Sequence, residues 1–122
     1  MKHFLPRLAR SGRAVFATLS ARVGSIEDNR AGGWYSYRAS KAALNQLVRS
    51  AAIELARGNK GAVCVALHPG TVATSLSSPF AKTGLDVQTP AEAATRLLAV
   101  IDGLTPAQSG MLLDHRGERI PF

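Results

Sequence analysis

Apolar and polar positions along the chain divide it into alternating strand-like and helix-like segments. Residues 13–19 combine β-branched, aromatic and small side chains, and residues 61–67 form a continuous apolar run, so both predict buried strands. Between them, residues 37–57 carry apolar side chains every three to four positions without glycine or proline, which predicts a long helix. These apolar positions cover a wide arc, so we expect the helix to bury two faces, one against a sheet and one against another helix.

Weaker signals extend the alternation toward both ends of the chain. Apolar side chains at helical spacing predict a helix over residues 2–10. The segment Thr89-Pro90-Ala91-Glu92 matches a capping box with proline at the first helical position, and it predicts a helix that ends near Asp102. Residues 111–114 predict a last short strand. Strands that alternate with helices indicate an α/β fold with a parallel sheet.

Two long loops interrupt this pattern. Residues 20–36 contain three glycines, and residues 71–88 follow His68-Pro69-Gly70, which ends the second strand. Loops of this length in a compact domain are frequently functional. Candidate chemistry is therefore expected at the strand ends that lead into them.

Composition limits the chain to one domain and a narrow set of partners. Its 122 residues suffice for one small domain, and 46% of them are hydrophobic, enough to bury a core. The formal net charge of +7 comes from scattered Lys and Arg side chains, which disfavours a nucleic-acid-binding patch. Two interpretations of the charge stay open: a solvated surface, or attraction for an anionic ligand such as a dinucleotide.

Membrane insertion and secretion have no support in the sequence. No stretch approaches the roughly 18 apolar residues that a spanning helix needs, and residues 1–6 lack a long apolar region. We therefore expect a soluble cytoplasmic protein. The single cysteine, Cys64, lies within an apolar run, so a buried core residue is favoured over a reactive thiol.

A tyrosine and a lysine begin the long predicted helix. Tyr37 and Lys41 are four residues apart, which places them on one face of a helix. An ammonium group beside a phenol favours its ionised form, and such a phenol can exchange a proton with a substrate oxygen. The same spacing also arises by chance in helices as a solvated pair, so the neighbouring segments decide between the two interpretations.

Those segments resemble the active-site region of short-chain dehydrogenases/reductases. The run Tyr35-Ser36-Tyr37-Arg38-Ala39-Ser40-Lys41-Ala42-Ala43-Leu44-Asn45 is similar to the catalytic helix of that family. The segment His68-Pro69-Gly70-Thr71-Val72-Ala73-Thr74 is similar to the family's Pro-Gly loop. Gly24-Ser25-Ile26 and the following Gly-Gly-Trp-Tyr stretch look most like the C-factor branch. Together these features cover most of the chain.

The resemblance implies a fold and a set of roles. The fold is the C-terminal portion of a Rossmann-type doubly wound parallel sheet whose N-terminal strands are missing, so that residues 1–122 form a single partial domain. Tyr37 is implied as the catalytic acid or base, and Lys41 as the residue that activates it. Both are implied to contact NAD or NADP, Lys41 through the nicotinamide ribose hydroxyls. The further contacts implied along the nicotinamide and its carboxamide are Pro69, Gly70, Thr71, Val72 and Thr74. A plain strand-to-loop turn is the alternative for that segment.

One position departs from the family's pattern. The family usually places a catalytic serine at the end of the strand before this helix, often as the second of a Ser-Ser pair. Here the second place is Ala21 and the first is Ser20. Ser20 is therefore the candidate to hydrogen-bond a substrate carbonyl, with a hydroxyl that caps the strand end as the alternative. Thr18 and Ser25 are weaker candidates.

The sequence contains no counterpart of the family's nucleotide-phosphate-binding turn. No Gly-x-x-x-Gly-x-Gly occurs, so we expect the chain alone to bind NAD(H) or NADP(H) weakly or not at all. Two functions stay open: an NAD(P)-dependent oxidoreductase of carbonyls or secondary alcohols that is truncated and inactive alone, and a non-enzymatic remnant that self-associates through residues 37–57. The substrate and the choice between NAD and NADP are not specified. No His, Cys or carboxylate cluster has metal-ligand spacing, so no metal site is expected.

Overall fold

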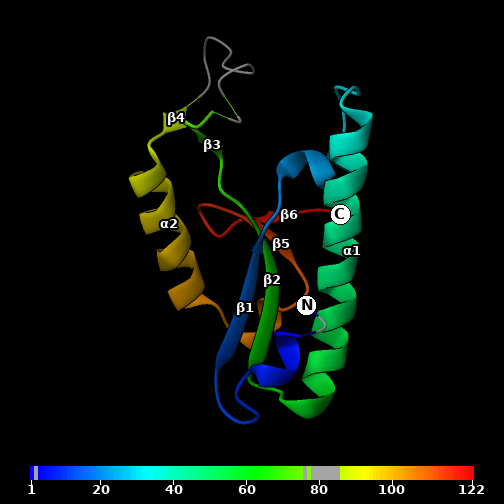
Figure 1. Cartoon of the computed structure of the whole chain (residues 1–122), viewed down its shortest axis with the longest axis vertical. Coiled ribbons are helices and arrows are strands. Elements are labelled where there is room, and N and C mark those ends of the chain that lie inside the picture. The colour runs from blue at the N-terminus through cyan, green and yellow to red at the C-terminus, as the bar shows by residue number, and fades with distance from the viewer. Residues whose placement is uncertain (2, 76, 78–85) are drawn as a thin grey trace.

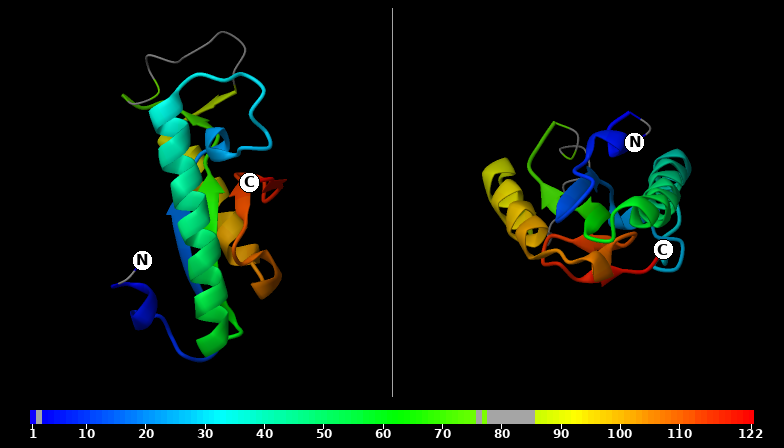
Figure 2. Two further views of the ribbon diagram at one scale, coloured as in Figure 1. Left: turned by 90° about the vertical axis from the view of Figure 1, so that its right-hand side faces the viewer. Right: turned by 90° about the horizontal axis from the view of Figure 1, so that it is seen from below.

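The computed structural model describes residues 1, 3–75, 77 and 86–122, and its centre is a four-stranded sheet between two helices (Figures 1 and 2). The sheet has the order β1-β2-β5-β6. Its strands are β1 (Ala14–Leu19), β2 (Ala62–His68), β5 (Leu112–Asp114) and β6 (Arg119–Ile120). The helices are α1 (Tyr35–Gly58) and α2 (Pro90–Gly103), one on each face of the sheet. Strands β1, β2 and β5 are parallel and β6 is antiparallel to β5, which confirms the predicted α/β class.

Strand β2 forms the centre of the core because both of its faces are covered. Its side chains alternate, so that Cys64 packs with Val48 of α1, whereas Val65 packs on the opposite face in the cluster that includes Val100 of α2. The first six residues of the strand are buried, which explains the continuous apolar run in the sequence. Burial raises the pKa of the Cys64 thiol to about 11. The prediction of a buried core cysteine is confirmed.

Helix α1 buries one face and leaves another exposed. The residues buried along it are Asn45, Val48, Ala51 and Ala52. Leu47 and Ile53 remain 58% and 48% exposed, so the described residues supply no cover for the second face that we predicted to be buried. The helix begins at Tyr35, two residues earlier than predicted, and ends at Gly58, one residue later than predicted.

Helix α2 begins as its sequence predicts. Thr89 Oγ1 accepts a hydrogen bond from Glu92 N at 3.2 Å, and Thr89 N donates to Glu92 Oε2 at 2.8 Å. The two bonds complete the capping box, and the bond from the Thr89 backbone is the main cause that lowers the pKa of Glu92. Neither this helix nor any other in the described part of the chain has the length and apolarity that a membrane crossing requires.

Three elements differ from the prediction. The helix expected over residues 2–10 is reduced to one 3-10 turn, η1 (Leu5–Arg7), because the backbone is extended again at Leu8 and no residue of the turn is buried. The loop over residues 71–88 contains two short paired strands, β3 (Thr71–Val72) and β4 (Val87–Gln88). Positions 76 and 78–85 of that loop lie outside the described residues. Strand β6 was not predicted.

Candidate active site

Tyr37 and Lys41 lie together on the first turns of α1, beside the carboxyl end of β1. Lys41 Nζ is 5.8 Å from the centroid of the Tyr37 ring and donates a hydrogen bond to Leu19 O at 3.1 Å. The Tyr37 side chain is 45% exposed. The phenol is therefore open to solvent with a cation beside it. Such a group can exchange a proton with a molecule bound at this edge.

Asn45 extends the same row of α1 by one more turn and holds Ser20. Ser20 Oγ donates a hydrogen bond to Asn45 Oδ1 at 2.7 Å, and both side chains are buried. Ser20 N also donates to Leu67 O at 2.8 Å, so this residue ties the end of β1 to both β2 and α1. To bind a substrate carbonyl, the Ser20 hydroxyl would have to exchange Asn45 for the substrate as acceptor. Thr18 Oγ1 is also buried, and Ala21 is 8% exposed.

The 3-10 helix η2 (Arg22–Gly24) packs tightly on α1 at Lys41. A Cβ at Gly24 would lie 2.7 Å from Lys41 Cβ and 2.8 Å from Lys41 C, so no larger residue fits there without displacement. Ser25 is buried, and its Oγ accepts a hydrogen bond from Asp28 N at 3.0 Å, which closes the next turn of the loop. The backbone around Lys41 is thus fixed by close contact with η2.

The segment from Pro69 to Thr74 leaves the carboxyl end of β2, the strand next to β1. Gln88 of β4 holds its start, because Gln88 Nε2 donates to Pro69 O at 3.0 Å. Gly70 has a φ of +80°, and a Cβ there would lie 2.5 Å from Gln88 Nε2. Thr71 and Val72 are partly buried in β3, and Thr74 is exposed. Since β1 and β2 are parallel neighbours, this segment starts at the same edge of the sheet as the Tyr37–Lys41 pair.

A neutral histidine lies at this edge. Burial is the main cause that lowers the pKa of His68 to about 4, and the charges of Arg22 and His115 act in the same direction. The Nδ1 atom of His68 and both ring nitrogens of His115 are buried without a hydrogen-bond partner among the described residues. His68 is therefore uncharged at neutral pH. The described side chains also include no group of three or more His, Cys, Asp or Glu placed to hold a metal ion.

Sequence reasoning missed two residues that hold the site together. Asn45 had a signal, because it continues the four-residue spacing of Tyr37 and Lys41 along one helix face. Gln88 had none, since its bond to Pro69 O joins residues 19 positions apart in a loop without regular pattern. Long-range polar contacts of that kind become visible only in the structure.

Comparison with known proteins identifies the family. A family model described as enoyl-(acyl carrier protein) reductase matches residues 1–102. The C-signal protein of Myxococcus xanthus is 41% identical over 119 residues, which cover 97% of this chain and 67% of that protein. The chain belongs to the short-chain dehydrogenase/reductase family. The resemblance drawn from the two sequence motifs, including its C-factor-like placement, is confirmed.

Other relatives show how much of the family fold is covered. A 1-hydroxy-2-glutathionyl-2-methyl-3-butene dehydrogenase of Rhodococcus sp. (strain AD45) is 44% identical over 97 residues, 80% of this chain and 42% of that protein. Carbonyl reductase Sniffer of D. melanogaster superposes with a TM-score of 0.78 at 28% identity, over 89% of this chain and 41% of that one. An NADPH-bound carbonyl reductase from chicken fatty liver superposes with a TM-score of 0.75 at 34% identity, over 89% and 43%. The chain thus spans less than half of each of these three proteins, and its fold matches part of the Rossmann-type fold of the two carbonyl reductases.

Proposed function

We propose that this chain carries the proton-transfer residues of an NAD(P)-dependent oxidoreductase that acts on a carbonyl or a secondary alcohol. The observation that carries the proposal is the exposed Tyr37 ring with the Lys41 ammonium 5.8 Å from its centroid. Family membership supports the reaction class, and the NADPH bound to the chicken carbonyl reductase supports the cofactor class.

In the direction of reduction, the nicotinamide supplies a hydride to the carbonyl carbon when it is bound. Tyr37 donates its hydroxyl proton to the carbonyl oxygen as negative charge develops there, so that the carbonyl becomes an alcohol. Lys41 stabilises the phenolate that remains, and solvent returns a proton to it. Oxidation of an alcohol runs through the same groups in reverse. Ser20 is proposed to orient the substrate oxygen after it exchanges its bond to Asn45.

The chain fits the nicotinamide end of the cofactor better than the phosphate end. Tyr37 and Lys41 lie at the sheet edge from which the Pro-Gly segment also starts. The segment's proposed contacts with the nicotinamide are Pro69, Gly70, Thr71, Val72 and Thr74. The N-terminus of α2 is occupied by its own capping box, and the sequence has no Gly-x-x-x-Gly-x-Gly turn. We infer that tight binding of NAD(H) or NADP(H) needs a phosphate-binding segment additional to these 122 residues.

The decisive experiment compares two neighbouring tyrosines. In a chain extended upstream with the dinucleotide-binding half of a family member, Tyr37→Phe should lower carbonyl-dependent NADPH oxidation by at least about 10²-fold. Tyr35→Phe is the matched control, because Tyr35 is 86% exposed two residues away and should keep its activity. Turnover retained in the Tyr37 variant would contradict the proposed function. Micromolar affinity of the 122-residue chain for NADPH would contradict the need for a further segment.

A second candidate function is self-association without catalysis. The exposed apolar side chains Leu47 and Ile53 on α1 favour it. Size-exclusion chromatography tests it: the chain should elute as a dimer or larger, and Leu47→Glu together with Ile53→Glu should return it to a monomer. A chain that is already monomeric at high concentration would exclude this function.

A further inference from the structure

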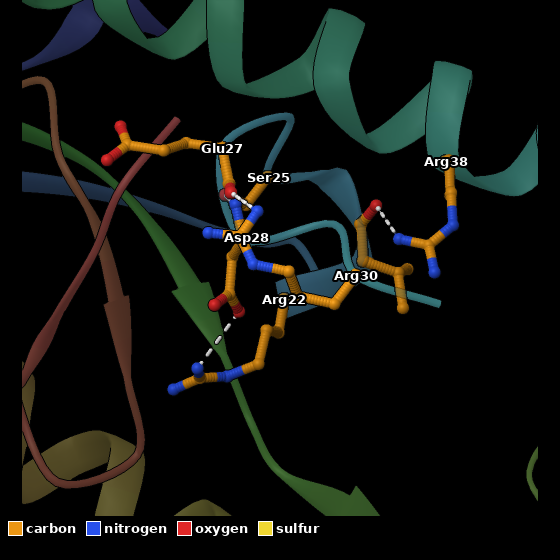
Figure 3. A network of polar contacts seen from close by, with 7 residues as sticks. Arg22, Ser25, Glu27, Asp28, Arg30 and Arg38 are labelled. Carbon is orange, nitrogen blue, oxygen red and sulfur yellow. Dashed lines mark hydrogen bonds and ion pairs between the residues drawn. The ribbon is translucent and has the colours of Figure 1, made fainter. Parts of the chain in front are cut away.

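Arg38, on the first turn of α1, connects both ends of the loop that precedes the helix. Figure 3 shows its side chain extending from the helix toward the loop that carries Arg22, Asp28 and Arg30. Its guanidinium donates hydrogen bonds to Val23 O at 3.2 Å, to Gly32 O at 3.0 and 3.2 Å, and to Gly33 O at 3.0 Å. Val23 belongs to η2, where the loop starts, and the two glycines lie just before α1, where it ends. One planar group thus bridges carbonyl oxygens that are far apart along the loop, a geometry suited to the five fixed donors of arginine.

The loop end that Arg38 holds has an unusual backbone. Gly32 and Gly33 have φ values of +62° and +69°, and Trp34 follows with φ 48° and ψ 41°. Trp34 is the one non-glycine residue in the described part of the chain with a positive φ. A bulky residue adopts this conformation when its surroundings hold it there. Arg38 supplies part of that restraint, because its guanidinium lies 5.8 Å from the centroid of the Trp34 ring.

The other charged contacts of this loop are local. Arg22 and Asp28 form an ion pair at 3.0 Å between residues six positions apart, and Arg30 donates to Glu27 O three positions away. Arg38, by contrast, reaches Val23 across 15 positions. Its side chain is partly buried, whereas its neighbours on the first turn are exposed. The side chain of Arg38 is therefore suited to holding the closed form of the loop.

We propose that Arg38 is a positioning residue, whose guanidinium closes the loop between η2 and α1 and keeps η2 seated on Lys41. The connection to Lys41 is short: Arg38 binds Val23 O, and the next residue, Gly24, packs on Lys41 too closely for a Cβ. Release of the loop would loosen this contact and the placement of Lys41 beside Tyr37. The effect on catalysis rests on the proposed function, whereas closure of the loop by Arg38 does not.

The test measures loop opening by amide hydrogen exchange on the 122-residue chain. The probes are Asp28 N, which bonds Ser25 Oγ, and Gly32 N, which bonds Asn29 Oδ1. Arg38→Gln should speed exchange at both amides by at least about tenfold. The variant loses the guanidinium hydrogen bonds that stabilise the closed loop, while the open loop, which lacks these bonds, is unaffected. Fluorescence of Trp34, the single tryptophan, should shift to the red at the same time.

Two further variants complete the test. Arg57→Gln is the control, since Arg57 is an exposed arginine in the last turn of the same helix, and its loop exchange should equal that of the unaltered chain. Arg38→Lys keeps charge and length but not the planar fork, so it should also speed exchange; this variant decides the matter if Arg38→Gln does not fold. Unchanged exchange at Asp28 and Gly32 in a folded Arg38 variant would overturn the proposal. A failure of the Tyr37→Phe experiment would remove the catalytic consequence and leave the exchange result standing.

Discussion

The two halves of α1 contact the rest of the molecule through different kinds of interaction, hydrogen bonds in the first half and apolar packing in the second. The first half makes directional polar contacts: Lys41 Nζ donates to Leu19 O, and Asn45 Oδ1 accepts from Ser20 Oγ. The second half packs Val48, Ala51 and Ala52 into an apolar cluster against the sheet. Apolar packing is non-directional and supplies most of the free energy of folding, whereas hydrogen bonds fix individual atoms. The comparison indicates that stability resides mainly at one end of the helix and the geometry of the site at the other.

The largest expected loss of stability comes from the apolar cluster against which the second half of α1 packs. Leu112 of β5 is fully buried in the cluster that covers Val48, so Leu112→Ala should lower the free energy of unfolding by about 2–5 kcal/mol. Leu98→Ala on α2 is the control, because Leu98 is 60% exposed. Urea unfolding followed by circular dichroism measures both. Similar losses in the two variants would mean that burial in this cluster does not set the stability of the fold.

Acid should destabilise the folded chain through His68, the last residue of β2. The pKa of His68 is lowered from 6.5 to about 4 in the folded chain, so folding favours its neutral form. The free energy of unfolding is therefore unaffected by His68 protonation above pH 6.5. It falls by up to about 3 kcal/mol as the pH drops from 6.5 toward 4, because the unfolded chain binds the proton more tightly. His68→Gln should flatten the stability profile in this window. Parallel profiles for His68→Gln and the unaltered chain would show that His68 does not set the acid response.

A smaller effect is expected where η2 meets α1. Gly24→Ala would place a Cβ 2.7 Å from Lys41 Cβ and should cost about 1–3 kcal/mol of stability through overpacking. Gly58→Ala is the matched control, because a Cβ there meets nothing within 4 Å and the position is helical. The control should be neutral or slightly stabilising in the same thermal or urea experiment. Equal behaviour of the two variants would mean that the η2 contact is looser than the structure shows.

The long periodic segments could be predicted from sequence, and the short elements could not. Apolar spacing alone predicts the helix over residues 37–57 and the buried strand over residues 61–67. The capping box of Thr89 and Glu92 predicts a helix start because its hydrogen bonds are local. Strands β3, β4 and β6 have two residues each, too few for any period, and form because distant segments pair. The helix expected over residues 2–10 had apolar spacing, but only one 3-10 turn forms there, and its Leu5 packs partly buried against the core cluster.

The site divides in the same way. Tyr37 and Lys41 could be found because one helix fixes their relation through spacing. The contacts of Ser20 with Asn45 and of Arg38 with Val23 depend on how the loop after β1 folds back on α1, which local sequence does not encode. The roles of Tyr37, Lys41 and Ser20 in a reaction stay predictions until the variants are assayed.

The single thiol in the middle of β2 is an intrinsic probe of how often the core opens. Cys64 is inaccessible and its pKa is about 11, so a thiol-labelling reagent at neutral pH can modify it appreciably only after the strand has come away from its neighbours. The labelling rate therefore reports how often the sheet opens, without any engineered probe.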